Sequence, residues 1–256
     1  MASKINLNKK SQVTIFVILA LIIVVIVILI FLLRSPPKTK VFDEDEPQAF
    51  IESCTNEYVE DAIFYISRHG GSIEPKGSIT FKDIDRNYLC YNNNYFEPCI
   101  NQHPLLIEEI ETEITNYIYR HLEVCFEELK QNFEKRYEVS LSPDMQVKTT
   151  LQHKNILIEI GRELETTRGD EARKFEKFEI HFDHPMYDLA EISMEIVNQE
   201  TQYCNFDVIG FMFLNPEYDV IKFITGDSNI IYQVTERSTD QKFTFATRGC
   251  VLPPNI

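Results

Sequence analysis

The sequence predicts an α+β protein with an N-terminal transmembrane helix, followed by long helices packed on a mainly antiparallel sheet. Three observations lead to this prediction. Residues 13–33 form an uncharged apolar run, later segments repeat apolar residues at helical spacing, and much of the remaining chain alternates apolar and polar residues as strands do. The expected parts are a basic N-terminal tail (1–12), the transmembrane helix (13–33), a linker (34–46) and an extracellular α+β domain (47–256).

The apolar run of residues 13–33 contains no charge, no glycine and no proline, and Thr14 is its only polar residue. At about 1.5 Å per residue such a helix spans roughly 30 Å, the thickness of the hydrocarbon core of a bilayer. A buried core helix would carry a polar stripe. A cleaved secretory signal would have a shorter apolar region ending in small residues, whereas this run is followed by Arg34-Ser35-Pro36-Pro37. We therefore expect a retained helix.

The helices of the domain are predicted from prolines, glycines and apolar stripes. The first helix begins at Pro47 and ends at Gly70-Gly71, and the second begins after Pro104 and continues to Phe133. The third begins at Pro185. A loop-rich segment with one short strand is expected between the first two helices. The predicted strands cover residues 78–81, 137–141, 145–151, 156–160, 177–182, 206–214, 220–224, 230–235 and 243–247.

All six cysteines lie beyond the apolar run, and an even number favours an oxidising compartment. The basic residues that flank the run are balanced, so they do not decide its orientation. We expect the domain to lie outside the cell, at the cell membrane. Cys54 and Cys125 lie on the apolar stripes of two predicted helices, and a disulfide can join them if these stripes pack together. The alternative to a full set of disulfides is that some cysteines are free and buried. The candidate disulfides are Cys54–Cys125, Cys90–Cys99 and Cys204–Cys250.

The charge of the chain limits its partners. All 40 acidic residues lie after Lys40, against 19 of the 25 basic residues. Nucleic acids and anionic lipid headgroups require a basic face, so neither is expected as a partner of the domain.

The chain shows no phosphate-binding loop, no dinucleotide-binding glycine motif and no nucleophile elbow. Arg68-His69-Gly70 is similar to the start of the histidine-phosphatase signature, but it lies where the first helix should end, which favours a helix cap. His181, Asp183 and His184 share a strand end, although zinc sites usually show stronger spacing. We expect no catalytic residue, no cofactor and no metal.

The N-terminal residues Lys9-Lys10-Ser11-Gln12, followed directly by the apolar run, resemble the class III signal of archaeal type IV pilin-like proteins. This resemblance implies cleavage between Ser11 and Gln12 and packing of the helix in a filament core. Ser11 stands where pilins have glycine or alanine, and Phe16 where they have glutamate. The domain resembles an uncharacterised family of membrane-anchored proteins of small-genome symbiotic archaea in its Ile51-x-x-Cys54 motif, Gly70-Gly71 turn and Cys125. That family implies no activity.

The expected function is that of a non-catalytic, membrane-anchored cell-surface protein for interaction or assembly, pilin-like or adhesive. Its partners would be the membrane, through residues 13–33, and a protein partner or further copies of itself. A second interpretation is a surface module that binds a cation or a sugar, suggested by the acidity and by a loop rich in aromatic and asparagine residues between Tyr88 and Phe96. An ecto-enzyme is the third, and no residue set supports it.

Overall fold

The computed structural model describes residues 19–24 and 46–253, and the chain divides into the units Met1–Glu44 and Asp45–Ile256. In the first unit, residues 19–24 are helical and carry exposed apolar side chains. Among the described residues, no helix is both long and apolar enough to cross a membrane. This finding overturns the transmembrane helix of the predicted fold. The rest of residues 13–33, the predicted tail and most of the linker lie outside the described residues.

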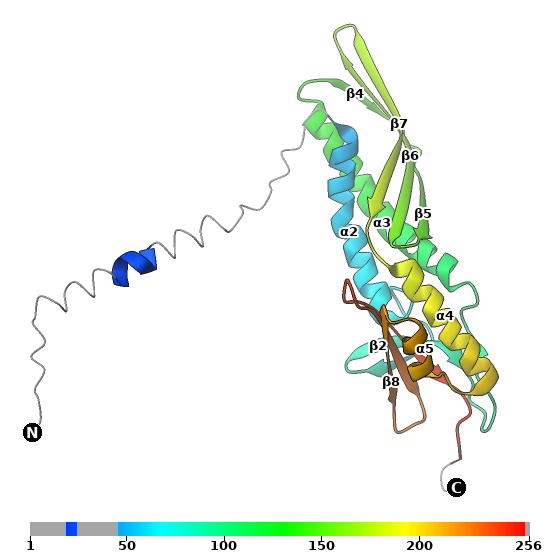
Figure 1. Ribbon diagram of the computed structural model, residues 1–256. Coiled ribbons are helices and arrows are strands. Elements are labelled where there is room, and N and C mark those ends of the chain that lie inside the picture. The colour runs from blue at the N-terminus through cyan, green and yellow to red at the C-terminus, as the bar shows by residue number, and fades with distance from the viewer. Residues whose placement is uncertain (1–18, 25–45, 254–256) are drawn as a thin grey trace, which may run out of the picture. The chain divides into compact units, whose positions relative to one another are not determined.

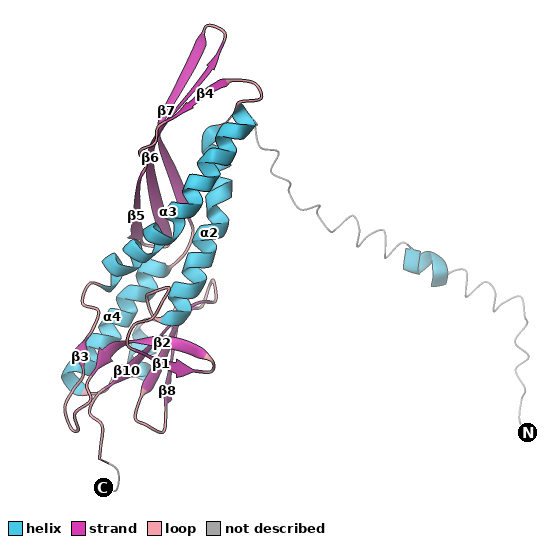
Figure 2. Ribbon diagram, turned by 180° about the vertical axis from the view of Figure 1, so that it is seen from behind, coloured by secondary structure: helices cyan, strands magenta, loops and turns pink. Residues whose placement is uncertain are grey.

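The second unit is an α+β domain whose helices and strands are shown in Figure 1 and, from behind, in Figure 2. Its helices are α2 (Pro47–His69), α3 (Leu106–Phe133), α4 (Met186–Tyr203) and α5 (Val208–Leu214). Its strands are β1 (Ser78–Phe81), β2 (Ile84–Tyr91), β3 (Ile100–Asn101), β4 (Glu138–Leu141), β5 (Gln146–Gln152), β6 (Asn155–Arg168), β7 (Glu171–Phe182), β8 (Tyr218–Ile224), β9 (Ile230–Glu236) and β10 (Gln241–Arg248).

The strands form two sheets. A six-stranded sheet has the order β1-β2-β10-β9-β8, with β3 paired to β2, and only its β2–β10 pairing is parallel. A four-stranded sheet has the order β4-β6-β5, with β7 paired to β6, and is antiparallel throughout. The prediction of one mainly antiparallel sheet is therefore corrected to two sheets, one of them mixed. The difference arises because β2 and β10 lie far apart in the sequence. Their parallel pairing has no local sequence signal.

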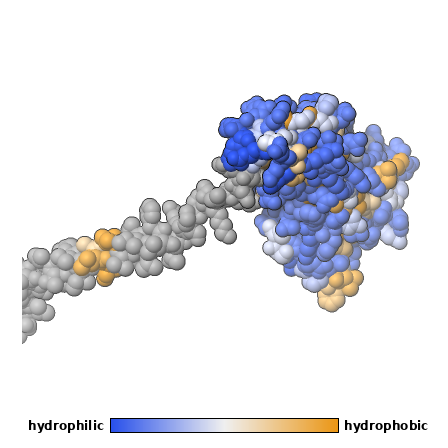
Figure 3. Space-filling view, turned by 90° about the horizontal axis from the view of Figure 1, so that it is seen from above, coloured by the Kyte–Doolittle hydropathy of each residue, from blue (hydrophilic) through white to orange (hydrophobic). Residues whose placement is uncertain are grey.

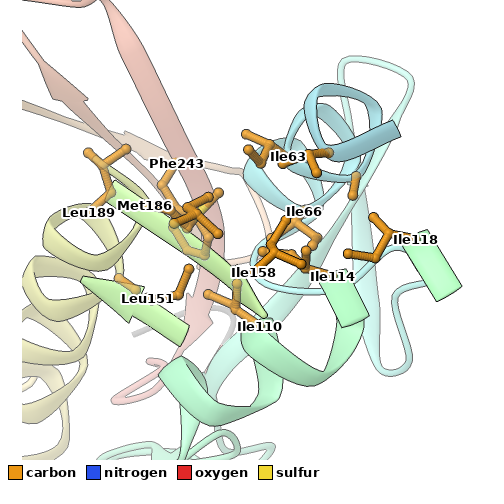
Figure 4. Close-up of a cluster of buried hydrophobic side chains, with 14 of the residues drawn as sticks. Ile63, Ile66, Ile110, Ile114, Ile118, Leu151, Ile158, Met186, Leu189 and Phe243 are labelled. Carbon is orange, nitrogen blue, oxygen red and sulfur yellow. The ribbon is translucent and has the colours of Figure 1, made fainter. Parts of the chain in front are cut away.

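Helices α2 and α3 pack side by side and connect the sheets, with β10 and β2 near the end of α2 and β5 and β4 along α3 (Figures 1 and 2). The stripe of α3 is fully buried at Ile110, Ile114 and Ile118, as its helical spacing predicts. Helix α2 ends at Gly70, whose left-handed φ of 74° lets its N–H bond to the Ile66 carbonyl. Figure 4 shows how side chains of α2, α3, α4, β5, β6 and β10 meet in the core.

Two segments differ from their predictions. Residues 206–214, predicted as a strand, contain helix α5, because the Asp207 side chain accepts a hydrogen bond from the Gly210 N–H and caps the helix. A short apolar run does not distinguish strand from helix by periodicity. The segment expected to be rich in loops contains the eight-residue strand β2 in addition to β1. Strands β6 and β7 also extend beyond the predicted 156–160 and 177–182.

Candidate binding sites

Strand β2 carries a β-bulge that brings two tyrosines to one face. Along β10, Ala246 and Thr247 are consecutive, but they pair with Tyr88 and Cys90, so β2 has one extra residue at this point. An extra residue shifts the alternation of side chains by one position. Tyr88 and Tyr91 therefore lie on the same face, and their ring centroids are 4.8 Å apart at an interplanar angle of 59°.

These tyrosines line a cavity of about 540 Å³, and a second cavity of about 370 Å³ shares two lining residues with it. Lys76 and His103 line both cavities. We call the two cavities together the tyrosine groove. The first cavity is lined by Lys76, Gly77, Ser78, Tyr88, Tyr91, Gln102 and His103. The second is lined by Gly71, Ser72, Glu74, Lys76, Asn87, His103, Leu105, Glu108, Glu109, Thr112 and Glu113.

The polar groups of the tyrosine groove are held by specific contacts. The Asn87 side chain is 2% exposed, and its Nδ2 donates to Ser72 Oγ at 2.8 Å. Its Oδ1 has no hydrogen-bond partner among the described residues. His103 Nδ1 lies 2.5 Å from Glu109 Oε2. The Asn87 oxygen is thus a buried group without a partner in the wall of the groove, which is unfavourable for stability.

The loop between Cys90 and Cys99 is closed by their disulfide. Within the loop, the side-chain amides of Asn92 and Asn94 donate to the Glu97 carboxylate, while Asn93 Oδ1 accepts a hydrogen bond from Arg248 on β10. The bonds from Asn94 and Asn92 lower the pKa of that carboxyl group. The loop is also bonded to the C-terminal segment, through Phe96 N–H to the Val251 carbonyl and Cys250 N–H to the Glu97 carbonyl. Tyr91, at the start of the loop, lines the groove.

His184, between β7 and α4, is 5% exposed and lies between cavities of about 310 and 280 Å³. Burial lowers the pKa of His184, and neither of its ring nitrogens has a hydrogen-bond partner among the described residues. His181 and Asp183, by contrast, are exposed. Within residues 19–24 and 46–253, no group of three or more His, Cys, Asp or Glu side chains is arranged to hold a metal ion. His181, Asp183 and His184 are therefore not arranged as ligands of one metal ion.

Arg68 and His69 lie at the C-terminal end of α2, as the helix-cap interpretation requires. His69 Nδ1 is 2.8 Å from the Ile73 carbonyl oxygen, and the Arg68 guanidinium is 4.6 Å from the centre of the Phe64 ring. Both side chains thus contact residues next to their own helix end, and neither contact indicates a phosphate site.

The face of the domain seen in Figure 3 is mostly hydrophilic, with small separate hydrophobic areas. Helix α5 is unusual because it exposes apolar residues. All seven of its residues, Val-Ile-Gly-Phe-Met-Phe-Leu, are apolar, and none of them is buried. Three of its side chains are largely exposed: Ile209 (79%), Phe213 (84%) and Leu214 (77%). We call these three residues the α5 patch.

All six cysteines are paired in the structure, which confirms that the domain is disulfide-bonded. The pairs are Cys54–Cys125, Cys90–Cys99 and Cys204–Cys250, the same as the candidate pairs. The first joins α2 to α3, and the last joins the end of α4 to the segment after β10. The candidate processing residues Ser11 and Gln12 lie outside the described residues.

Sequence reasoning missed Asn87, His103 and Glu109 as groove residues. Their types are common on any surface, and the strand that carries Asn87 was not predicted. The comparisons with known proteins add no assignment: no family model, no curated protein and no solved structure matches the chain.

Proposed function

We propose that the chain is a non-catalytic interaction protein of an oxidising compartment, such as the cell surface, and that it assembles with a protein partner or with further copies of itself through the α5 patch. The observation that carries this proposal is the exposure of Ile209, Phe213 and Leu214 on a helix that has no polar residue. Clustered apolar side chains exposed to water are unfavourable, and in soluble domains they commonly mark interaction sites.

The α5 patch is supported from beneath. The Asp207 cap fixes the start of α5, and the Asn215 N–H closes its end by bonding to the Phe211 carbonyl. The Val220 N–H on β8 is 3.4 Å from Met212 Sδ, which holds the helix on the sheet. A patch presented on fixed backbone loses little conformational entropy when it binds, which favours association.

Two further properties are consistent with this proposal. The pairing of all six cysteines favours a compartment in which disulfides persist. The excess of 40 acidic over 25 basic residues gives the chain a net charge of −15, which opposes non-specific aggregation. Against such a background, a few large apolar residues can act as the anchors that supply most of the binding energy of an interface.

Site-specific photocrosslinking in cells that produce the chain tests the proposal. A benzophenone amino acid replaces Phe213 in one variant and Ile100, which is 65% exposed, in a matched control. We expect a discrete adduct of defined mass from position 213 and none from position 100. The mass of the adduct distinguishes a second copy from another protein.

A second substitution establishes that the adduct depends on the α5 patch. Ile209→Ser is added to the chain that carries the crosslinker at position 213, and we expect the adduct to be lost while circular dichroism remains unchanged. The absence of an adduct at position 213, or the same diffuse products from positions 213 and 100, would contradict the proposal.

A further inference from the structure

We infer that the tyrosine groove binds a neutral or amino-sugar oligosaccharide. This site is built from β2, the loop before β1 and the start of α3, and it uses no residue of the α5 patch. Three features support the inference: an aromatic platform, the fixed orientation of its rings and an acidic lining.

The aromatic platform is Tyr88 and Tyr91. The faces of sugar rings carry C–H groups that pack on aromatic rings, while phenol hydroxyls accept and donate hydrogen bonds at the platform edge. The bulge in β2 is the reason that both rings line the cavity of about 540 Å³, because regular alternation would place them on opposite faces. Bulges commonly re-aim side chains beside functional sites.

Both rings of the platform are fixed in place. The Tyr88 hydroxyl donates to Asn229 Oδ1 at 2.8 Å, and Asn229 is itself buried. The Arg248 guanidinium lies 5.8 Å from the centre of the Tyr91 ring and donates to the Asn92 carbonyl at 2.7 Å. A platform with these restraints is already ordered before a ligand arrives, which lowers the entropic cost of binding.

The polar lining suits a ligand rich in hydroxyl groups. Gln102 lines the cavity of about 540 Å³ and carries a side-chain amide with donors and an acceptor, and Ser78 adds a hydroxyl group that can donate and accept. Sugar hydroxyls can form hydrogen bonds with both kinds of group.

The negative charge of the groove lining favours some classes of sugar over others. Four glutamates line the cavity of about 370 Å³, namely Glu74, Glu108, Glu109 and Glu113, against the single lysine Lys76. A carboxylate-bearing sugar would be repelled by this lining, whereas a neutral sugar meets hydrogen-bond acceptors and an amino sugar meets opposite charge. The two cavities have the volumes typical of small-ligand sites.

Isothermal titration calorimetry on the full chain tests the inference. The probes are maltotriose, mannotriose, N,N′,N″-triacetylchitotriose, its deacetylated amine form and trigalacturonic acid. We expect binding of at least one neutral or amine trisaccharide and none of trigalacturonic acid. Tyr91→Ala should weaken that binding about tenfold or more, because the platform is lost.

The matched control is Tyr95→Ala, which removes a half-exposed tyrosine of the same disulfide-closed loop that does not line the groove. It should leave the affinity unchanged. Gln102→Ala provides a second groove variant if Tyr91→Ala does not fold, as judged by circular dichroism. Failure of every neutral and amine probe to bind, preference for trigalacturonic acid, or equal affinities of the Tyr95→Ala and groove variants would overturn the inference.

The outcome of this experiment is separate from that of the crosslinking at α5. Loss of sugar binding in Tyr91→Ala leaves the adduct at Phe213 intact if both proposals hold. Failure of one test therefore leaves the other proposal standing.

Discussion

The hydroxyl group of Tyr232 on β9 donates a hydrogen bond to the carboxylate of Glu200 on α4, and both side chains are buried. Lys222 Nζ on β8 lies 3.3 Å from the same carboxylate. Burial, followed by the charge of Glu200, raises the pKa of Tyr232, so the phenol keeps its proton and remains a donor. Helix α4 is thus attached to the six-stranded sheet by a buried charge, which is tolerated because it is paired and hydrogen-bonded.

Replacing Tyr232 with phenylalanine tests this attachment. Tyr232→Phe removes one hydrogen bond to a charged group without changing the ring, and we expect a loss of about 1.5–3 kcal/mol in the free energy of unfolding. Urea denaturation followed by circular dichroism measures the loss. Tyr203→Phe, at a position that is 70% exposed, is the control and should change little. Equal stabilities of the two variants would show that the contact contributes nothing.

The disulfides should differ in their contributions to stability. Cys54–Cys125 joins residues 71 positions apart, and Cys90–Cys99 joins residues nine positions apart. In the chain-entropy model, the longer loop contributes about 4 kcal/mol and the shorter about 2.5 kcal/mol. We therefore expect the double alanine variant at positions 54 and 125 to have a lower urea midpoint than the double alanine variant at positions 90 and 99. Since each variant removes two sulfur atoms, a reversed order would show that strain or packing outweighs loop entropy.

The sequence predicts α2 and α3 well because a regular stripe and end residues such as Gly70 act locally. Strand β2 is different, since its central residues Arg86 and Asn87 are polar yet buried. Arg86 donates to the Arg68 carbonyl and Asn87 to Ser72, so their burial depends on partners that only the folded chain supplies. Periodicity of apolar residues does not reveal such a strand.

The same limit applies to the candidate sites. The aromatic loop beside Tyr91 is visible in the sequence, but the bulge that aligns Tyr88 with Tyr91 depends on pairing with β10. The exposure of Phe213 is likewise invisible, because an apolar run of seven residues is as easily a buried strand as an exposed helix. The pairing of Cys54 with Cys125 could be predicted as a hypothesis, because each lies on the apolar stripe of a helix and the two stripes can pack together.

Glu236 should make stability depend on pH. Burial raises the pKa of this carboxyl group, but hydrogen bonds from Ser238 and Thr239 outweigh burial, and the pKa is lowered. A folded-state pKa below the unfolded value stabilises the protein above the unfolded pKa, near 4.3, and this contribution is lost as the pH falls through the folded pKa.

We therefore expect Glu236→Gln to be less stable than the wild type at neutral pH, and the difference to shrink in acid. Urea denaturation at about pH 7 and about pH 3 measures both differences. Glu128→Gln, which changes an exposed carboxylate on α3, should show no such trend. A difference for Glu236→Gln that is the same at both pH values would mean that the carboxylate charge is not the origin of the effect.

Gly249 is required by a close approach between two chain segments. A Cβ atom at this position would lie 2.6 Å from the Cys99 backbone nitrogen and 2.9 Å from Cys99 Cβ, closer than such atoms can come. Cys99 cannot easily move away, because it is bonded to Cys90 and because the neighbouring Cys250 N–H bonds to the Glu97 carbonyl at 2.6 Å. Gly249→Ala should therefore lower the free energy of unfolding by about 1–3 kcal/mol through overpacking.

Gly226→Ala is the matched control, since a Cβ there meets no atom within 4 Å, and it should be neutral or slightly stabilising. The urea midpoints of the two alanine variants measure this difference in stability. If Gly249→Ala were as stable as Gly226→Ala, the two chain segments could separate without a loss of stability.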